Sequence, residues 1–401
     1  MAKGQPRKFG KCTLVKPLGR GATAVVYLAK HEGLGIPVAV KVLRGSVSRT
    51  RPEYAVRFLR EARMAAWLDH PNLVRVIDCG IQDGYYYMVM DYVDGPNCLQ
   101  KLQEDEGGMD WRVTSDIIRQ AAAGLAYAAG RDVIHRDVKP SNIMIDTTGR
   151  ARVTDLGLAK LTVKGMAELT QELQTVGTPN YMSPEQIRSP SDLDLRADIY
   201  SLGASYFHMV TGRPPFIGRN QMDVVAQHLT RAIDPPSKVR RGLPAQLSSI
   251  VCKMMAKSPD KRYQDYESLH ADLDGLLAGK AVTAEGFVES HLDDKEDEQL
   301  ARLLVRLGSG RSVEIFDEES DDAPPRPTAQ TNNGHASSTP LDPFEPAELK
   351  TYKTPPAHED STVLVPQQRK AEPRDRLFWL LAIMVVLGII AIGVVIWLGR
   401  K

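Results

Sequence analysis

Residues 133–146 read VIHRDVKPSNIMID and carry the most specific pattern in the chain. Asp137 and Asn142 flank Lys139, and Asp155 follows in the next segment, ARVTDLGLAK. We expect a rigid loop held between a VI strand and an IMI strand. Carboxylate and amide oxygens are the ligands preferred by Mg²⁺ bound to phosphates, and Asp137 is placed to orient a hydroxyl. The spacing therefore indicates phosphate chemistry.

The N-terminal segment FGKCTLVKPLGRGATAVVYLAKHE, residues 9–32, predicts a strand, a glycine turn and a second strand, and IPVAVKVL predicts a third. Gly19 and Gly21 let backbone N–H groups approach a phosphate closely, although a GxG turn alone is more typical of a plain hairpin. Lys41 ends the apolar run VAV, where an unpaired ammonium is costly, so its partner is a phosphate or a carboxylate. Glu61 follows in a segment of helical periodicity, but spacing alone leaves Lys41 and Glu61 readable as surface residues.

Taken in order, these motifs resemble those of the eukaryotic-type (Hanks-type) Ser/Thr protein kinases over residues 9–279, about two thirds of the chain. The segment from Gly19 to Val26 is similar to the glycine-rich loop, VAVK to the strand with the ATP-contacting lysine and HRD to the catalytic loop. DLG and SPE are similar to the DFG and APE motifs, Asp198 to the helix aspartate that anchors the catalytic-loop backbone, and Arg262 to the arginine that pairs with Glu185 of SPE. Ala24 replaces the third glycine and Leu156 replaces the phenylalanine, and neither change removes a reacting group.

The resemblance implies an α+β, bilobed protein kinase fold, in which a β-rich lobe with one helix packs over a larger helical lobe. Asp137 would orient the substrate hydroxyl and accept its proton, Lys139 would neutralise charge on the γ-phosphate, and Glu61 would form the ion pair that holds Lys41. The implied metal ligands, for Mg²⁺ or alternatively Mn²⁺, are Asn142 and Asp155. The residues implied to bind ATP are Leu18, Gly19, Arg20, Gly21, Ala22, Thr23, Ala24, Val25, Val26, Lys41, Asp91 and Val93.

The implied reaction is transfer of the ATP γ-phosphate to Ser or Thr hydroxyls of protein substrates, with autophosphorylation. The VKPSN loop and Thr178 favour Ser/Thr over Tyr substrates. Arg136 implies an activation loop that phosphorylation orders, with Thr170 and Thr175 as the candidate acceptors. Phosphorylation in trans would use a homodimer. A pseudokinase scaffold and a small-molecule kinase are two alternatives, and the intact motifs argue against both. A tail-anchored adaptor whose acidic linker is the working part is the third, and deletion of 281–373 would separate it from catalysis.

The charge balance excludes two classes of protein. The 401 residues include 51 Lys+Arg and 50 Asp+Glu, with a formal net charge of +1. A strongly basic nucleic-acid binder and a wholly acidic disordered chain are therefore excluded, and we expect no nucleic-acid partner. The four cysteines form no CxxC pair, unlike those of a disulfide scaffold or a Cys-rich zinc site, and fit a reducing compartment.

The composition changes after the kinase-like segment. Residues 281–373 hold 19 acidic and 9 basic residues and are rich in Pro, Ser and Thr. Such a segment cannot bury enough apolar surface to offset its ordering entropy, so we expect a disordered juxtamembrane linker over 280–376. Leucines at helical spacing in 291–307 predict one short amphipathic helix, which either docks on the globular block or stays solvated.

The C-terminal run LFWLLAIMVVLGIIAIGVVIWL, residues 377–398, contains no charge over 22 residues. A helix of this length spans roughly 33 Å, enough to cross a bilayer, and Trp379 and Trp397 stand near its two ends as interfacial anchors do. Basic residues before the run favour a cytoplasmic kinase domain. The sequence thus predicts a single-pass protein of the inner membrane, similar to bacterial membrane-anchored members of the family.

Overall fold

The computed structural model describes residues 7–46, 52–105, 107–156, 179–189, 192–289 and 295–308. The candidate phosphosites Thr170 and Thr175 and the apolar run 377–398 lie outside these residues. In the described part of the chain, no helix is both long and apolar enough to cross a membrane.

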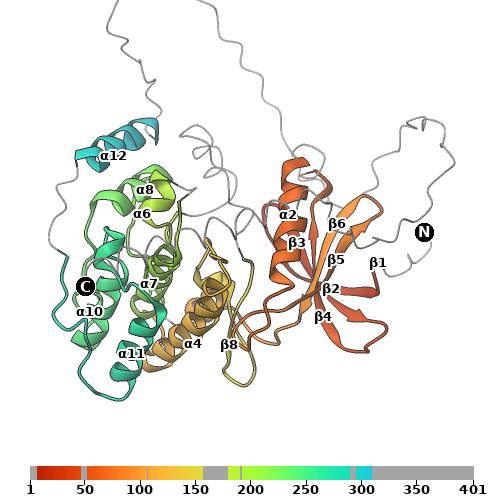
Figure 1. Ribbon diagram of the computed structural model, residues 1–401, viewed down its shortest axis with the longest axis horizontal. Helices are drawn as coiled ribbons and strands as arrows, with labels where there is room; N and C mark the ends of the chain where they lie inside the picture. The colour runs from red at the N-terminus through yellow and green to blue at the C-terminus, as the bar shows by residue number, and fades with distance from the viewer. Residues whose placement is uncertain are drawn as a thin grey trace, which may run out of the picture. The chain divides into compact units, whose positions relative to one another are not determined.

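A six-stranded antiparallel sheet forms the N-terminal lobe, with the strand order β1-β2-β3-β4-β6-β5 (Figure 1). The β2–β3 pair is the expected strand, glycine turn and strand, and its register shifts beside Pro17, which has no N–H to donate. β4 pairs with β6, so that Lys41 lies opposite Met88. The strands are β1 (Lys8–Phe9), β2 (Cys12–Arg20), β3 (Ala24–His31), β4 (Pro37–Leu43), β5 (Val76–Gln82) and β6 (Tyr85–Asp91).

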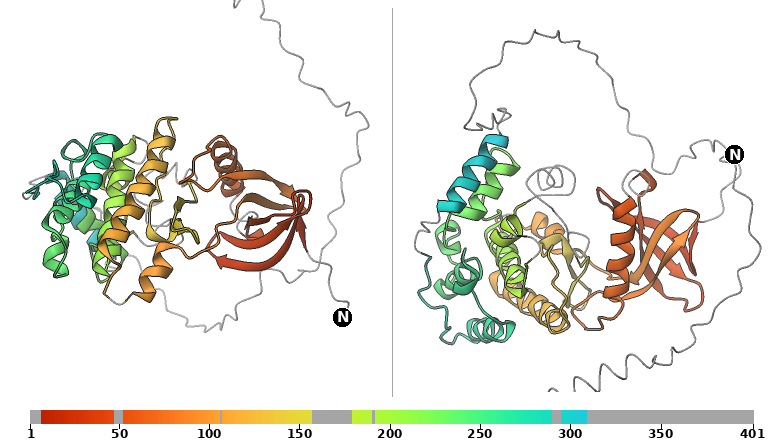
Figure 2. Two further views of the ribbon diagram at one scale, coloured as in Figure 1. Left: turned by 90° about the horizontal axis from the view of Figure 1, so that it is seen from below. Right: turned by 45° about the horizontal axis from the view of Figure 1, so that its top comes forward.

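One helix, α2 (Pro52–Ala65), covers this sheet and contacts β5 and β6 (Figure 2). Its buried apolar residues recur at helical spacing, as in Phe58, Ala62 and Ala65, and Glu61 lies on the same buried face. Burial of the apolar side chains stabilises the helix against the sheet, whereas burial of the Glu61 carboxylate is costly by itself.

The C-terminal lobe is built around α7 (Leu195–Thr211), which is buried over almost all of its surface. Such a helix needs neighbours on every side, and α4 and α10 pack against it (Figure 2). The other elements of this lobe are α3 (Cys98–Glu104), α4 (Trp111–Ala129), η1 (Pro140–Asn142), β7 (Ile143–Ile145), β8 (Ala151–Val153), α6 (Pro184–Arg188), α8 (Gln221–Thr230), α9 (Pro236–Val239), α10 (Ala245–Met254), η3 (Pro259–Lys261) and α11 (Tyr266–Leu277).

The segment 133–146 runs from the end of α4 through η1 and contains β7, the first strand of the two-stranded β7–β8 sheet. The IMI strand is confirmed as β7, but Val133 and Ile134 form no strand, so that expectation was wrong. Instead, the Val133 N–H donates to the Ala128 carbonyl and closes the end of α4.

The predicted amphipathic helix exists as α12 (Lys295–Gly308) and packs on α8 (Figure 1). Leu304 is fully buried there, together with Met222, Val225 and Leu229 of α8. Of the two alternatives for this helix, docking is the one observed. The first residues of the segment expected to be linker therefore belong to the folded unit.

Candidate active site

A cleft runs between the glycine turn of the β2–β3 pair and the loops around β7, and it consists of two adjoining hollows. The larger, of about 440 Å³, is lined by the glycine turn together with Lys41, Glu61, Asp137, Lys139, Asn142 and Asp155. The smaller, of about 290 Å³, is lined by Leu18 and other apolar side chains, by Asp91 at the end of β6 and by the residues that follow it, including Val93. The structure thus brings residues from distant parts of the sequence to one cleft.

Almost all of the residues expected to bind ATP line this cleft. Val25 is the exception, because neighbouring residues of a strand point to opposite faces and Val26 is the one that faces the hollows. Sequence reasoning missed Ala39, Val74 and Met144, which line the smaller hollow. Strand alternation could have found Ala39, which shares a face with Lys41, whereas no sequence signal points to Val74 or Met144.

Lys41 forms its ion pair with Asp155, at 2.8 Å between Nζ and Oδ1. The expected ion pair between Lys41 and Glu61 is not formed among the described residues, and the carboxylate that the ammonium contacts is that of Asp155. Burial alone would lower the pKa of Lys41, but the charges of Asp155 and Glu61 raise it above its ordinary value. Lys41 is therefore a cation at neutral pH.

Glu61 lies in an apolar pocket beside Ala65, Val76, Met88 and Leu156. Burial raises the pKa of Glu61 to about 7, although the charge of Lys41 acts in the opposite direction. Near neutral pH, Glu61 is thus balanced between a neutral acid and a carboxylate that attracts Lys41.

We expect this titration to appear in the pH dependence of stability. Between its ordinary pKa of 4.5 and about 7, Glu61 binds a proton in the folded protein but not in the unfolded chain. The free energy of unfolding contributed by this group therefore falls as the pH rises through that window. Glu61→Gln removes the titration, so its Tm should exceed that of the wild type by roughly 7–13 °C at pH 8 and by less than half as much at pH 5.5.

The control for this comparison is Glu267→Gln, which changes an exposed glutamate. Thermal melting of the three proteins across pH 5–8.5 gives the result. A Tm difference between Glu61→Gln and the wild type that is constant with pH would contradict the raised pKa.

Asp198 of α7 fixes the backbone of the loop 133–146. Its two carboxylate oxygens accept the N–H groups of His135 and Arg136 at 2.7 and 2.8 Å. Arg136 has a φ of +65°, which costs energy for a residue with a Cβ, so the loop conformation depends on such anchors. The expected anchoring role of Asp198 is confirmed. His135 is fully buried and contacts the Thr154 carbonyl at 3.0 Å, in agreement with a structural role.

Asp137 faces the larger hollow with its side chain held on two sides. Lys139 Nζ donates to Asp137 Oδ2 at 2.7 Å, and Asn142 Nδ2 donates to the same oxygen at 3.2 Å. Asn142 Nδ2 also donates to the Asp137 main-chain carbonyl, at 2.9 Å. The Asp137 carboxylate is therefore pre-oriented toward the cleft and lies next to a positive charge.

Asn142 and Asp155 suit a divalent cation bound to phosphates. The Asn142 amide nitrogen is engaged by Asp137, which leaves its oxygen as the group that can coordinate. Asp155 supplies a carboxylate to the same hollow, and a φ of +57° marks its backbone as strained. One carboxylate and one amide oxygen, with phosphate oxygens completing the shell, match the preference of Mg²⁺.

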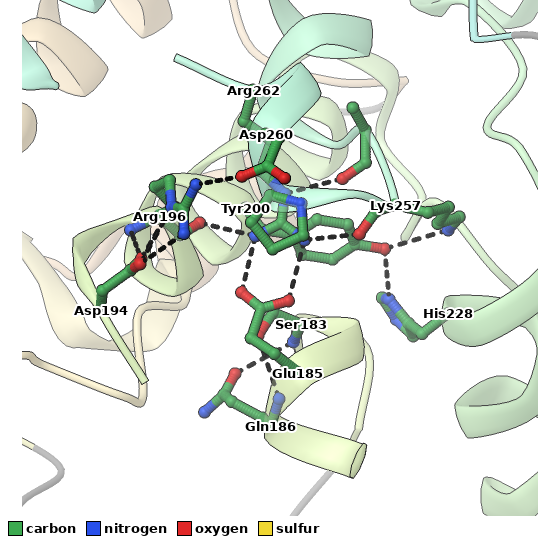
Figure 3. A network of polar contacts seen from close by, with 12 residues as sticks. Ser183, Glu185, Gln186, Asp194, Arg196, Tyr200, His228, Lys257, Asp260 and Arg262 are labelled. Carbon is green, nitrogen blue, oxygen red and sulfur yellow. Dashed lines mark hydrogen bonds and ion pairs between the residues drawn. The ribbon is translucent and has the colours of Figure 1, made fainter. Parts of the chain in front are cut away.

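The short helix α6 (Pro184–Arg188) contacts the loop 133–146 and is anchored from several directions (Figure 3). The Arg262 guanidinium holds the Glu185 carboxylate through two bonds of 2.6 and 2.8 Å, which confirms the predicted pair. Ser183 and Gln186 cap the helix reciprocally. Gln186 Nε2 also donates to the Arg136 carbonyl at 2.8 Å, a contact that the sequence did not predict.

A model of the protein kinase domain matches residues 12–272 of the chain. The serine/threonine-protein kinase PknB of Mycobacterium leprae is 39% identical over 271 residues, which cover 67% of this chain and 43% of that protein. PrkC of Bacillus subtilis, also a serine/threonine-protein kinase, is 33% identical over 298 residues, 74% of this chain and 44% of that protein. The chain thus spans about two fifths of the length of these curated relatives.

Among solved structures, the kinase domain of Mycobacterium tuberculosis PknI is similar to this one. Its crystal structure has a TM-score of 0.55 and 29% sequence identity, and the match covers 69% of this chain and 100% of that one. The agreement extends over both the strand-rich and the helical parts described above.

Proposed function

Because the chain belongs to the protein kinase domain family, in the branch of the bacterial Hanks-type Ser/Thr kinases, we propose that it is a membrane-anchored serine/threonine protein kinase that transfers the γ-phosphate of ATP to proteins. One observation carries the proposal: Lys41, Asp137, Asn142 and Asp155 line a single cleft, with Asp137 already oriented by hydrogen bonds. The smaller hollow would take the adenine ring, with the backbone of Asp91 and Val93 along its edge.

In the proposed reaction, a substrate hydroxyl oxygen bonds to the γ-phosphorus of ATP while the bond from that phosphorus to the bridging oxygen of ADP breaks. Asp137 accepts the hydroxyl proton late in the transfer, since a carboxylate is a weak base toward an unreacted alcohol. Lys139 stabilises negative charge on the transferring group, and Lys41 orients the α- and β-phosphates. Mg²⁺ on Asn142 and Asp155, with Mn²⁺ as an alternative, would supply charge neutralisation at the phosphates.

In this scheme, binding of ATP and a metal ion would separate Lys41 from Asp155. The phosphates would compete for the Lys41 ammonium, and the metal ion would compete for the Asp155 carboxylate. The buried Glu61 carboxylate could then hold the ammonium. A pseudokinase scaffold is the second candidate. The alignment of Lys41, Asp137 and Asp155 in one cleft favours catalysis over this alternative.

The proposed activity is tested with the full chain in isolated membranes. We expect Mg²⁺-dependent transfer of label from γ-labelled ATP to the chain and to a basic carrier protein, with phosphoserine or phosphothreonine as the product. Truncation after residue 373 should release an active kinase from the membrane fraction. Absence of transfer under all metal conditions would leave the pseudokinase scaffold as the function.

The uncharged run 377–398 supports the membrane anchor and an inner-membrane location with a cytoplasmic kinase domain. Protease added to right-side-out vesicles should leave the kinase domain intact. Digestion of the domain in such vesicles would contradict the proposed orientation.

A phosphorylated activation loop is the second part of the proposal. The Arg136 guanidinium is half-buried, and its Nε and Nη1 have no hydrogen-bond partner within the described ranges. Burial lowers the pKa of Arg136, so a dianionic partner would stabilise the charged side chain. A phosphate on Thr170 or Thr175 adds about −1.5 to −2 charge and meets this need.

We therefore expect the double variant Thr170→Ala/Thr175→Ala to phosphorylate a peptide at least about tenfold more slowly than the wild type, because the loop lacks its charged anchor. Thr147→Ala, which changes an exposed threonine in a surface turn, is the matched control. A homodimer formed on the membrane would make the reaction in trans depend on protein concentration. Equal rates for the double variant and the wild type would rule out this activation mechanism.

A further inference from the structure

The helix α12 packs on α8 and also contacts α6. Leu304 is fully buried within an apolar cluster that includes Ile187 of α6 and Val225 of α8, and Ala301 of the same helix is buried as well. Leu303, one position along the helix, is 36% exposed. One face of α12 therefore packs as a protein core does, although the segment lies beyond the domain boundary that the sequence suggested.

Polar contacts fix the same helix at both ends. Near its start, the Asp297 carboxylate forms an ion pair with the Arg188 guanidinium of α6, and Asp297 is only 3% exposed. At its end, Asn220 Nδ2 donates to the Gly308 carbonyl at 3.2 Å. Loss of one member of a buried pair leaves an uncompensated charge, so removal of Asp297 or Arg188 alone should loosen this end of α12.

α6 depends on such support because it has only five residues, too few for a helix to be stable alone. Arg262 holds it at Glu185, the capping box holds its start, and α12 holds its last residue, Arg188 (Figure 3 shows the first two anchors). On its other side, α6 supplies the Gln186 amide that holds the Arg136 carbonyl. Arg136 has a strained φ and directly precedes Asp137, so a shift of α6 would move the catalytic loop.

We propose that α12 is a positioning element of the active site, and that Asp297 and Arg188 are positioning residues acting through α6 on Arg136 and Asp137. The inference rests on the proposed kinase function for its effect on turnover, and on the contacts alone for its effect on the loop. Anything that draws α12 away from α6 and α8 would then lower the rate of phosphate transfer while leaving the ATP cleft in place.

The experiment uses the full chain with Asp297→Asn, Asp297→Arg, Arg188→Asp and the double charge swap, and with Glu298→Arg as the control. Glu298 is the next residue of α12 and pairs with Arg302 at the exposed surface. We expect Asp297→Arg and Arg188→Asp to lower kcat about tenfold with KM for ATP within twofold of the wild type, and Asp297→Asn to lower kcat about threefold. The swap should recover at least half of the wild-type kcat, and Glu298→Arg should retain it.

Hydrogen exchange supplies a readout that does not depend on activity. Peptides that cover 133–146 and 184–188 should exchange at least tenfold faster in Asp297→Arg than in the wild type and Glu298→Arg. If Asp297→Arg does not fold, Asp297→Asn carries the same comparison. A folded variant with unchanged or raised kcat and unchanged hydrogen exchange would overturn the proposal. A double charge swap that restores neither the kcat nor the exchange rates of the wild type would also overturn it. Faster exchange in a chain without transfer activity would support the positioning role and reject the kinase function.

Discussion

Asp137→Asn is expected to lower phosphate transfer by about 1,000-fold, within the range that loss of a positioned proton acceptor produces. Asn has nearly the shape of Asp, and its side-chain oxygen can still accept from Lys139, which donates to Asp137 at 2.7 Å in the wild type. The loop should therefore keep its conformation. What the variant loses is the carboxylate that orients the substrate hydroxyl and takes its proton.

The measurement is the initial rate of transfer to a protein substrate at saturating ATP, together with ATP affinity by titration. ATP affinity should change less than threefold, because Asp137 is assigned to the hydroxyl and not to the nucleotide. Asp132→Asn is the matched control, since Asp132 is an exposed residue just before the same loop, and asparagine tolerates its positive φ. A rate for Asp137→Asn equal to that of Asp132→Asn would contradict the assigned role.

The sequence predicted those parts of the fold that depend on local pattern. The strand, glycine turn and strand, the helix that bears Glu61, and the β7 strand all follow from alternation or helical periodicity over a few residues. The likeness of short motifs to a known family then supplied the long-range pairs, such as Arg262 with Glu185 and Asp198 with the His135 and Arg136 amides. Spacing alone would have supplied neither.

The remaining features depend on how separate elements meet. The choice of Asp155 over Glu61 as the partner of Lys41 is set by where α2 lies on the sheet and by the strained turn at Asp155, neither of which has a local signature. Asp297 stands in the acidic run DDKEDE, which has the composition of a solvated surface, yet it is buried against Arg188. Burial of a charge is decided by its partner, and a composition profile does not contain the partner.

Lys41→Met is expected to reduce autophosphorylation to below about one-thousandth of the wild-type rate while the fold stays intact. Lys41 is the cation assigned to the ATP phosphates, and a preorganised charge in a water-excluded site contributes strongly to a highly charged transition state. Met has a similar length and no charge, so it fills the same space between the sheet and α2 but cannot orient the phosphates.

The effect of Lys41→Met on stability should be small for a reason that the structure supplies. Without the ammonium, Glu61 and Asp155 face each other as two carboxylates, but the pKa of Glu61 is already raised to about 7 by burial and would rise further. At neutral pH, Glu61 would then be protonated, and Asp155, whose side chain is 33% exposed, would remain hydrated. We expect a Tm within about 4 °C of the wild type at pH 7 and a larger loss above pH 8, where Glu61 ionises.

Lys30→Met, at an exposed position of β3, is the control for the loss of a lysine. Wild-type autophosphorylation by Lys41→Met at an unchanged Tm would remove Lys41 from the mechanism, and with it the phosphate role of the larger hollow.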